Sequence, residues 1–142
     1  MKDKQLTYKD VCTALYKDKK VYYTDAYGDI VNMSSSEMTE DTLCDSNNAS
    51  TKYQLEYIFA KNKLANVAKY LNDGWKPWHD KSITSIVVLK ETETGVSPRE
   101  VIIGSCSSVC GSIWFKSKEL AQQAIEILGE ETVKLALEPL GI

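Results

Sequence analysis

The single histidine and the four cysteines are the residues of this chain whose side chains could form a catalytic nucleophile or bind a metal ion. A Cys–His nucleophilic pair would need His79 beside Cys106 or Cys110. Nothing in the sequence places these groups together, because a long stretch of chain separates them. A surface histidine in the turn after Trp78 is the simpler interpretation. The sequence therefore favours a protein that is not an enzyme.

A zinc site is the second chemistry that these residues could support. Cys106 and Cys110 have a Cys-x3-Cys spacing, whereas structural zinc usually takes four ligands from paired clusters. His79 and Cys44 could complete a set of four, but Cys44 falls in a polar connector. If residues 106–110 are extended, both thiols point to one face and pack as small apolar groups. We therefore expect four free thiols, no metal ion and no other cofactor.

A stretch of small residues surrounds these two cysteines. Eight of the nine residues from 104 to 112 are Gly, Ser or Cys. Small residues in strands often mark the close approach of a ligand or of another backbone, so the stretch is a candidate ligand pocket or homo-oligomer interface. A tight hairpin turn without any partner is the alternative, and both interpretations stay open. The contact residues would be Gly104, Ser105, Ser107, Gly111 and Ser112, with Trp114 as an apolar wall.

Two tryptophans form the other candidate binding site. Trp75 and Trp78 bracket Pro77, which fixes their relative placement at a low entropic cost. Such a pair could stack on a base, a peptide or another ring. The alternative, which we favour for Trp75, is a core position between a helix and the sheet. A second aromatic patch beside an acidic loop is typical of a protein-binding surface, unless it packs onto the helices. Its residues are Tyr22, Tyr23 and Tyr27.

Periodicity and turn residues predict the elements that must position these side chains. The prediction comprises a helix from Thr7, a hairpin of 21–24 and 30–33, a polar connector over 34–50, a long helix over 51–72, strands at 83–90, 100–106 and 109–115, and helices at 117–128 and 130–138. The long helix should bury Ile58, Leu64, Ala68 and Leu71, and Gly95 and Pro98 should lie in the turn between the first two strands. The predicted class is α+β: a small antiparallel sheet, made of a three-stranded meander plus the N-terminal hairpin, packed against the long helix and two C-terminal helices.

Composition narrows the class of protein further. A chain of 142 residues predicts a single domain over residues 1–142, with a variable part over 1–50 and a core over 51–142. A net charge of −3 with 43% apolar residues argues against disorder. No apolar stretch is long enough for a membrane span, and the charged N-terminus does not resemble a signal peptide, so we expect a cytoplasmic protein. Arg99 is the only arginine, which disfavours binding to duplex DNA.

Two segments carry a resemblance to a known group of proteins. They are residues 64–78 (LANVAKYLNDGWKPW) and residues 111–121 (GSIWFKSKELA). Together they resemble small uncharacterised proteins of bacteriophages and prophages of gut bacteria, which pair an LNxGWKPxW helix end with a GSxxxFKSxELAxxA junction. The resemblance covers roughly residues 55–137, and many relatives differ in having an acidic residue between Pro77 and Trp78. The first 50 residues match no family.

The resemblance implies an origin and no catalytic residues. It suggests a non-enzymatic phage accessory protein in the cytoplasm of the bacterial host, where the protein would bind a host component such as a defence protein or a signalling nucleotide. One alternative is a minor virion protein, either capsid-associated or packaged, with other virion proteins as partners. A second alternative is a protein that binds single-stranded nucleic acid through Trp75 and Trp78.

Overall fold

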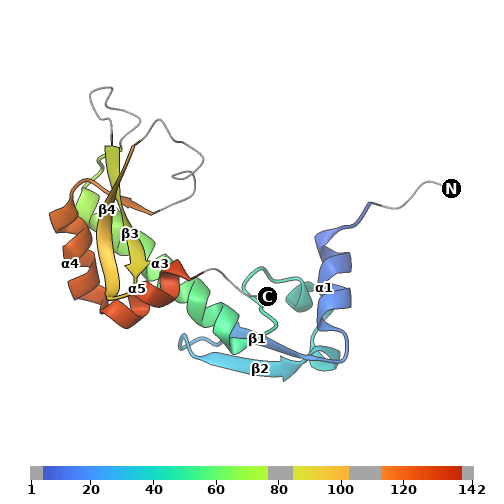
Figure 1. The fold of residues 1–142 in the computed structure, drawn as a ribbon. Helices are drawn as coiled ribbons and strands as arrows, with labels where there is room; N and C mark the ends of the chain where they lie inside the picture. The colour runs from blue at the N-terminus through green and yellow to red at the C-terminus, as the bar shows by residue number, and fades with distance from the viewer. Residues whose placement is uncertain (1–4, 77–84, 103–112, 139–142) are drawn as a thin grey trace. The chain divides into compact units, whose positions relative to one another are not determined.

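The computed structural model describes residues 5–76, 85–102 and 113–138 of the chain (Figure 1). The chain divides into two compact units, Met1–Glu56 and Tyr57–Ile142, so the boundary falls within the first turns of the long helix α3. The single domain expected over residues 1–142 stays a prediction. In chain order the elements are α1 (Tyr8–Tyr16), β1 (Lys20–Thr24), β2 (Ile30–Ser34), the 3-10 helix η1 (Ser35–Glu37), α2 (Glu40–Leu43), α3 (Lys52–Asn72), β3 (Ser85–Thr92), β4 (Gly95–Ile102), β5 (Trp114–Phe115), α4 (Lys118–Leu128) and α5 (Glu130–Leu137).

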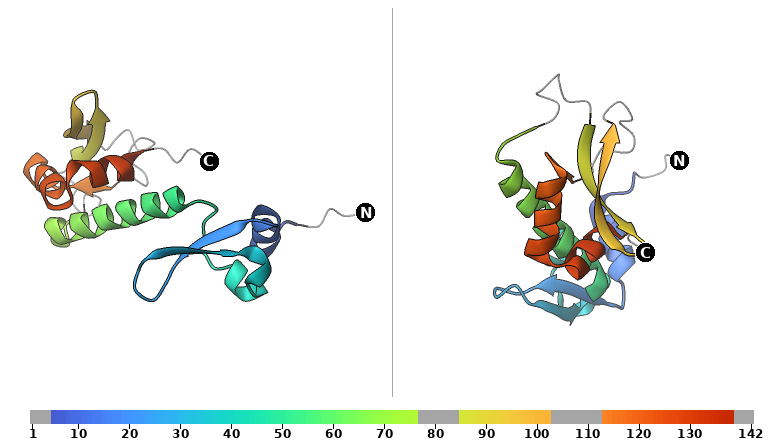
Figure 2. Two further views of the ribbon diagram at one scale, coloured as in Figure 1. Left: turned by 90° about the horizontal axis from the view of Figure 1, so that it is seen from below. Right: turned by 60° about the vertical axis from the view of Figure 1, so that its left-hand side comes forward.

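The first unit begins with the helix and hairpin that the sequence predicts. Thr7 and Asp10 form a capping box at the start of α1, in which the Thr7 hydroxyl accepts from the Asp10 N–H at 3.2 Å and the Asp10 carboxylate accepts from the Thr7 N–H at 3.0 Å. β1 and β2 then pair antiparallel (Figures 1 and 2). The loop between them is held by the carboxylate of Asp25, which accepts from the N–H groups of Tyr27 and Asp29.

A small hydrophobic core holds this unit together. Cys12, Tyr16 and Val21 are buried, and side chains of the connector, Met38, Leu43 and Cys44, pack against them. The polar connector therefore folds as the short helices η1 and α2 rather than as a bare loop. Its apolar side chains pack against a cluster that joins α1, at Cys12 and Tyr16, to β1, at Val21.

The buried Tyr16 makes this core sensitive to alkaline pH. Burial, followed by the charges that Cys12 and Tyr8 would carry, raises the pKa of Tyr16 from 10.0 to about 12. The folded state thus favours the neutral phenol, and this contribution is complete below pH 10 and lost as the pH rises through about 12. We expect Tyr16→Phe to flatten the loss of stability over this pH range in urea unfolding. Tyr27→Phe, at an exposed tyrosine, should leave the pH profile of the parent unchanged. Identical profiles for all three proteins would contradict this role of Tyr16.

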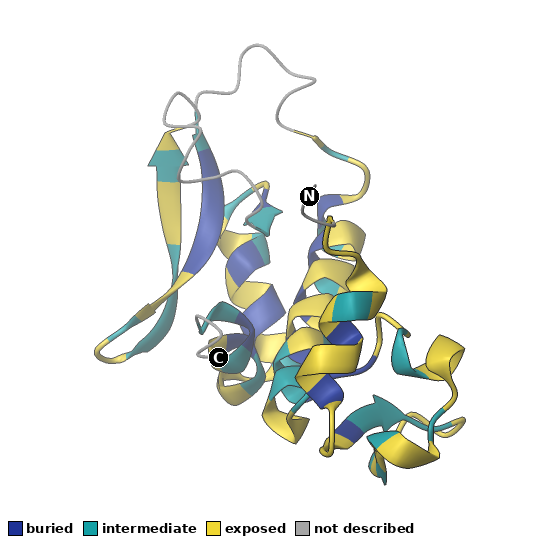
Figure 3. Cartoon of the chain, turned by 90° about the vertical axis from the view of Figure 1, so that its right-hand side faces the viewer, coloured by how far each residue is buried: buried dark blue, intermediate teal, exposed yellow. Residues whose placement is uncertain are grey.

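The second unit contains a three-stranded antiparallel sheet in the order β4-β3-β5. The α+β class is confirmed, but the meander order is wrong, because β3 and not the second strand is central. β3 pairs with all of β4, from Ser85 opposite Ile102 to Thr92 opposite Gly95, and with β5 at Val87 and Val88. Figure 3 shows the consequence: β3 is buried from Ile86 to Leu89, while β4 is half-buried or exposed along its length.

The predicted turn and second strand are also corrected. β4 begins at Gly95 and includes Pro98 opposite Leu89, so neither residue lies in a turn. Only Glu93 and Thr94 connect the two strands. Pro98 is tolerated because β4, among the described residues, pairs only with β3, and an edge strand can leave one backbone nitrogen without a ladder bond. Of the predicted third strand, the structure describes β5 at Trp114–Phe115, and residues 103–112 lie outside the described residues.

Three helices cover one face of this sheet and close the main core. Ala60, Leu64 and Ala68 of α3 contact buried residues of the sheet, among them Val87 and Phe115. The buried residues of α4 and α5 complete the cluster and are Ala121, Ala124, Ile125, Val133 and Ala136. As predicted, α4 begins at the cap residue Ser117, whose hydroxyl accepts from the Leu120 N–H at 3.3 Å. Among the described residues, no helix is long and apolar enough to cross a bilayer.

The buried face of α3 is only partly the predicted one. Leu64 and Ala68 are buried and Leu71 packs on the core, but Ile58 is 41% exposed. At 100° per residue, Ile58 lies about 120° around the helix from Leu64, the centre of the stripe of positions 60, 64 and 68, and thus outside the stripe. The prediction for Ile58 was wrong because the contacts follow every fourth residue.

This stripe gives a direct test of the core. Leu64 is 1% exposed, so Leu64→Ala should lower the free energy of unfolding by about 2–5 kcal/mol through lost contacts and a residual cavity. Ile58→Ala removes a side chain that is 41% exposed and does not belong to the core cluster, and we expect a loss of about 1 kcal/mol or less. Urea unfolding followed by circular dichroism would measure both. Equal effects of the two substitutions would show that the face of α3 is assigned wrongly.

Candidate functional site

The C-terminus of α3 positions the first part of the candidate site. The helix ends at Asn72, and Asp73 and Gly74 follow with positive φ values of 47° and 80°. This left-handed turn, which the sequence predicts from Gly74, ends the helix. The Trp75 N–H then donates to the Asn72 carbonyl at 2.9 Å, which fixes Trp75 immediately beyond the helix end.

The side chain of Asn72 links this helix end to β5. Its Nδ2 donates to the Trp114 carbonyl at 3.0 Å, and its Oδ1 accepts from the Lys116 N–H at 2.9 Å. Asn72 is 7% exposed, so both bonds form away from solvent. The side-chain amide thus pairs with the carbonyl of Trp114 in β5 and with the N–H of Lys116 directly after it, as the backbone of a neighbouring strand would.

Two tryptophans meet beside this link. The ring centroids of Trp75 and Trp114 lie 5.3 Å apart with an interplanar angle of 74°, an edge-to-face arrangement. Trp75 is half-buried and does not belong to the described hydrophobic core. It forms a wall against Trp114 rather than the core position that we favoured from the sequence.

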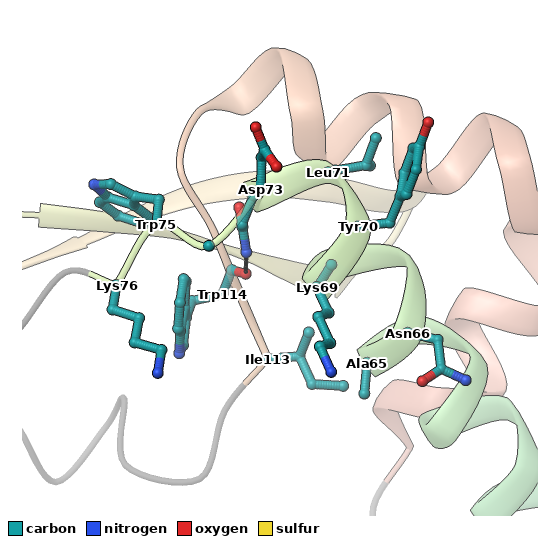
Figure 4. A pocket seen from close by; sticks show the side chains of 13 residues that line it. Ala65, Asn66, Lys69, Tyr70, Leu71, Asp73, Trp75, Lys76, Ile113 and Trp114 are labelled. Carbon is teal, nitrogen blue, oxygen red and sulfur yellow. Dashed lines mark hydrogen bonds between the residues drawn. The ribbon is translucent and has the colours of Figure 1, made fainter.

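A groove of about 1040 Å³ opens along these residues. Its lining continues from the last turns of α3 to Lys76 and Ile113 (Figure 4). Figure 4 shows the ammonium groups of Lys69 and Lys76 on the same side of the helix end as the Trp114 ring, whereas Asp73 points to the other side. Within the described part of the chain, neither lysine forms an ion pair, so both cations can interact with a ligand.

The structure places only some of the predicted site residues. Trp75 and Trp114, which the sequence assigned to two separate sites, lie in one groove. The remaining candidates lie outside the described residues: Trp78, Gly104, Ser105, Ser107, Gly111 and Ser112, together with His79, Cys106 and Cys110.

Sequence reasoning missed Asn72, Lys69 and Lys76 as site residues. One signal could have identified the region, because the segments 64–78 and 111–121 that carry the phage resemblance are the two segments that meet here. Asn72 contacts the backbone at Trp114 and Lys116, and these contacts join the two segments.

The described cysteines lie in the first unit, away from the groove in sequence. Cys12 is buried, Cys44 is half-buried and both are free thiols. Burial, followed by the nearby Cys12, raises the pKa of the Cys44 thiol, which keeps it protonated near neutral pH. Among the described residues, no group of three or more His, Cys, Asp or Glu side chains is arranged to bind a metal ion.

Comparison with known proteins identifies no relative of this chain. No protein-family model, curated protein or solved structure matches the chain.

The Asn72 link predicts a specific loss of stability. Asn72→Asp keeps an oxygen for the Lys116 N–H but removes the N–H that donates to the Trp114 carbonyl. The buried carboxylate would face that carbonyl near the negative end of the helix dipole, so we expect a loss of about 1–3 kcal/mol or more. Asn62→Asp, at an exposed position of α3, is the matched control. Chemical unfolding of both variants should separate them, and equal stabilities would contradict the link.

Proposed function

We propose that this chain is a non-enzymatic phage accessory protein that binds a signalling nucleotide of its bacterial host in the groove beside Trp75 and Trp114. The observation that carries this proposal is the combination of two tryptophan rings with the ammonium groups of Lys69 and Lys76 on one side of the helix end. The phage origin and the host cytoplasm rest on the resemblance of the two segments that form the groove.

The tryptophans favour a ligand with a flat ring. An edge-to-face pair holds each indole in a fixed orientation, so a base could stack without first ordering the side chains. Stacking of a base on an aromatic side chain contributes about 1–3 kcal/mol. The volume of about 1040 Å³ is at the upper end of the range for small-molecule sites, which suits a nucleotide or a dinucleotide.

The lysines favour a ligand with phosphates. A lysine ammonium acts as a compact point charge toward a phosphate and needs no bidentate geometry. Lys69 and Lys76 come from either side of the turn at Asp73 and Gly74, and their ammonium groups lie on both sides of the Trp114 ring in Figure 4. The phosphates of a base stacked on the ring could therefore reach a cation that lines the same groove.

The binding experiment described below also distinguishes two other functions, the binding of a host defence protein and the binding of single-stranded nucleic acid. A host defence protein would be bound through a larger surface than this groove, so small nucleotides would not compete with it. Single-stranded nucleic acid uses the same rings and cations, but its affinity would rise with strand length and fall steeply with salt. A small nucleotide that binds as tightly as an oligonucleotide favours our proposal over both.

Titration calorimetry with mononucleotides, cyclic dinucleotides and a short single-stranded oligonucleotide would test the proposal. We expect one of the small nucleotides to bind. Trp75→Ala should weaken its binding by roughly 5- to 150-fold, the equivalent of one lost stacking contact. The double variant Lys69→Gln with Lys76→Gln should weaken binding and reduce its dependence on salt.

Lys63→Gln is the control, because Lys63 is exposed on α3 and does not line the groove. It should bind the nucleotide like the parent chain. The proposal fails if none of the small nucleotides binds, or if the Lys69 and Lys76 double variant binds as tightly as the Lys63 variant.

A further inference from the structure

A second cleft lies wholly within the first unit, between the β1–β2 hairpin and the connector. Its volume is about 420 Å³, and its apolar lining comes from Tyr23, Met33 and Met38. Its charged lining comes from the carboxylates of Glu37 and Asp45. No lysine or arginine of the described residues lines it, so the charge that the cleft presents is negative.

The two carboxylates are not neutralised by the chain itself. A lysine does reach this region, because Lys9 forms an ion pair with Glu40. Glu40 does not line the cleft, however, and neither Glu37 nor Asp45 forms an ion pair within the described part of the chain. The exposed Glu37 and Asp45 are therefore open to a cation from outside.

A buried amide makes this cleft more than a group of acidic residues. Asn48 is 8% exposed, and its Nδ2 donates to the carbonyls of Thr42 at 2.7 Å and Leu43 at 3.2 Å. Both amide hydrogens are thus used to cap α2. The amide oxygen accepts no hydrogen bond within the described part of the chain, and Asn48 belongs to the lining of the cleft.

The hydrogen bonds of the described residues also bear on the solvent access of the Asn48 oxygen. Among the described residues, every side-chain nitrogen or oxygen without solvent access has a hydrogen-bond partner. The Asn48 oxygen has none, so it keeps some contact with solvent, and Asn48 is one of the residues that line the cleft. A buried amide whose only open group is an acceptor favours a ligand that donates hydrogen bonds.

The other polar groups of the cleft point to the same ligand chemistry. The hydroxyls of Thr39 and Thr42 are engaged with each other at 2.8 Å and in the cap of α2. One oxygen of Asp45 accepts from the Asn47 N–H at 2.8 Å, which orients this carboxylate and leaves its second oxygen available. Among the lining groups, the two carboxylates are the charged ones, and the Asn48 oxygen is a further acceptor that no group of the described chain uses.

We propose that this cleft binds an organic cation that has an ammonium or guanidinium head and an apolar stem. The head would donate to Glu37, Asp45 and the Asn48 oxygen, and charge-assisted bonds of this kind are the strong ones. The stem would lie on Met33 and Met38, whose flexible thioether side chains adapt to a ligand, with the Tyr23 ring beside it. Such a cation is either the arginine or lysine side chain of a peptide or a free polyamine.

Nuclear magnetic resonance titration of the full chain with two probes would test this site. The probes are spermidine and a short peptide with one arginine and blocked ends. We expect at least one of them to shift the resonances of Tyr23, Met33 and Met38, and the shifts should weaken with added salt. The tighter probe distinguishes a polyamine site from a site for a basic peptide.

Charge-removing variants make the test specific. Glu37→Gln combined with Asp45→Asn should weaken binding about tenfold or more, because each substitution keeps the size of the side chain but removes its negative charge and one of its two acceptor oxygens. Asp41→Asn removes one charge from α2 outside the cleft and should bind like the parent chain. If the double variant fails to fold, judged by the resonances of Val21 and Tyr16, Glu37→Gln alone replaces it. The proposal is overturned if neither probe binds, or if the Glu37 substitution has no larger effect than Asp41→Asn.

Discussion

The side-chain amide of Asn72 is the contact on which the groove of the second unit depends. β5 contains only two residues and pairs with β3 at Val87 and Val88, so its own ladder is too short to fix its orientation. The Asn72 amide donates a hydrogen bond to the Trp114 carbonyl and accepts one from the Lys116 N–H. These groups would otherwise be unpaired, and an unpaired buried polar group costs about 1–3 kcal/mol. Asn72 thus completes the sheet where no further strand of the described residues does.

The same short strand connects the hydrophobic core to the binding surface. Side chains alternate along a strand, so Phe115 enters the core at 0% exposure while Trp114 turns to the groove and meets Trp75. α4 begins directly afterwards at its cap, Ser117. A change in the packing of Phe115 would therefore move Trp114. In this way the core and the Asn72 amide together determine the distance between the two indole rings, which is the geometry that a stacked base would require.

The features that the sequence predicts correctly are those decided by neighbouring residues. The capping box at Thr7, the hairpin around Asp25, the helix end at Gly74 and the cap at Ser117 each depend on residues a few positions apart. The strand order does not, because pairing of β5 with β3 rather than with β4 is decided by long-range packing and by the Asn72 amide. A lone asparagine at a helix end has no pattern that reveals a partner more than 40 residues away. For the same reason Trp75 and Trp114 were assigned to separate sites.

The most direct measurement of this account is the proximity of the two indole rings in solution. Nuclear Overhauser contacts between the ring protons of Trp75 and Trp114 should be present in the parent chain, because their centroids lie 5.3 Å apart. In Asn72→Asp these contacts should weaken or disappear, while the methyl resonances of Leu64 keep the pattern of a folded core. Absence of the contacts in the parent chain, or unchanged contacts in the variant, would contradict the claim that Asn72 builds the groove.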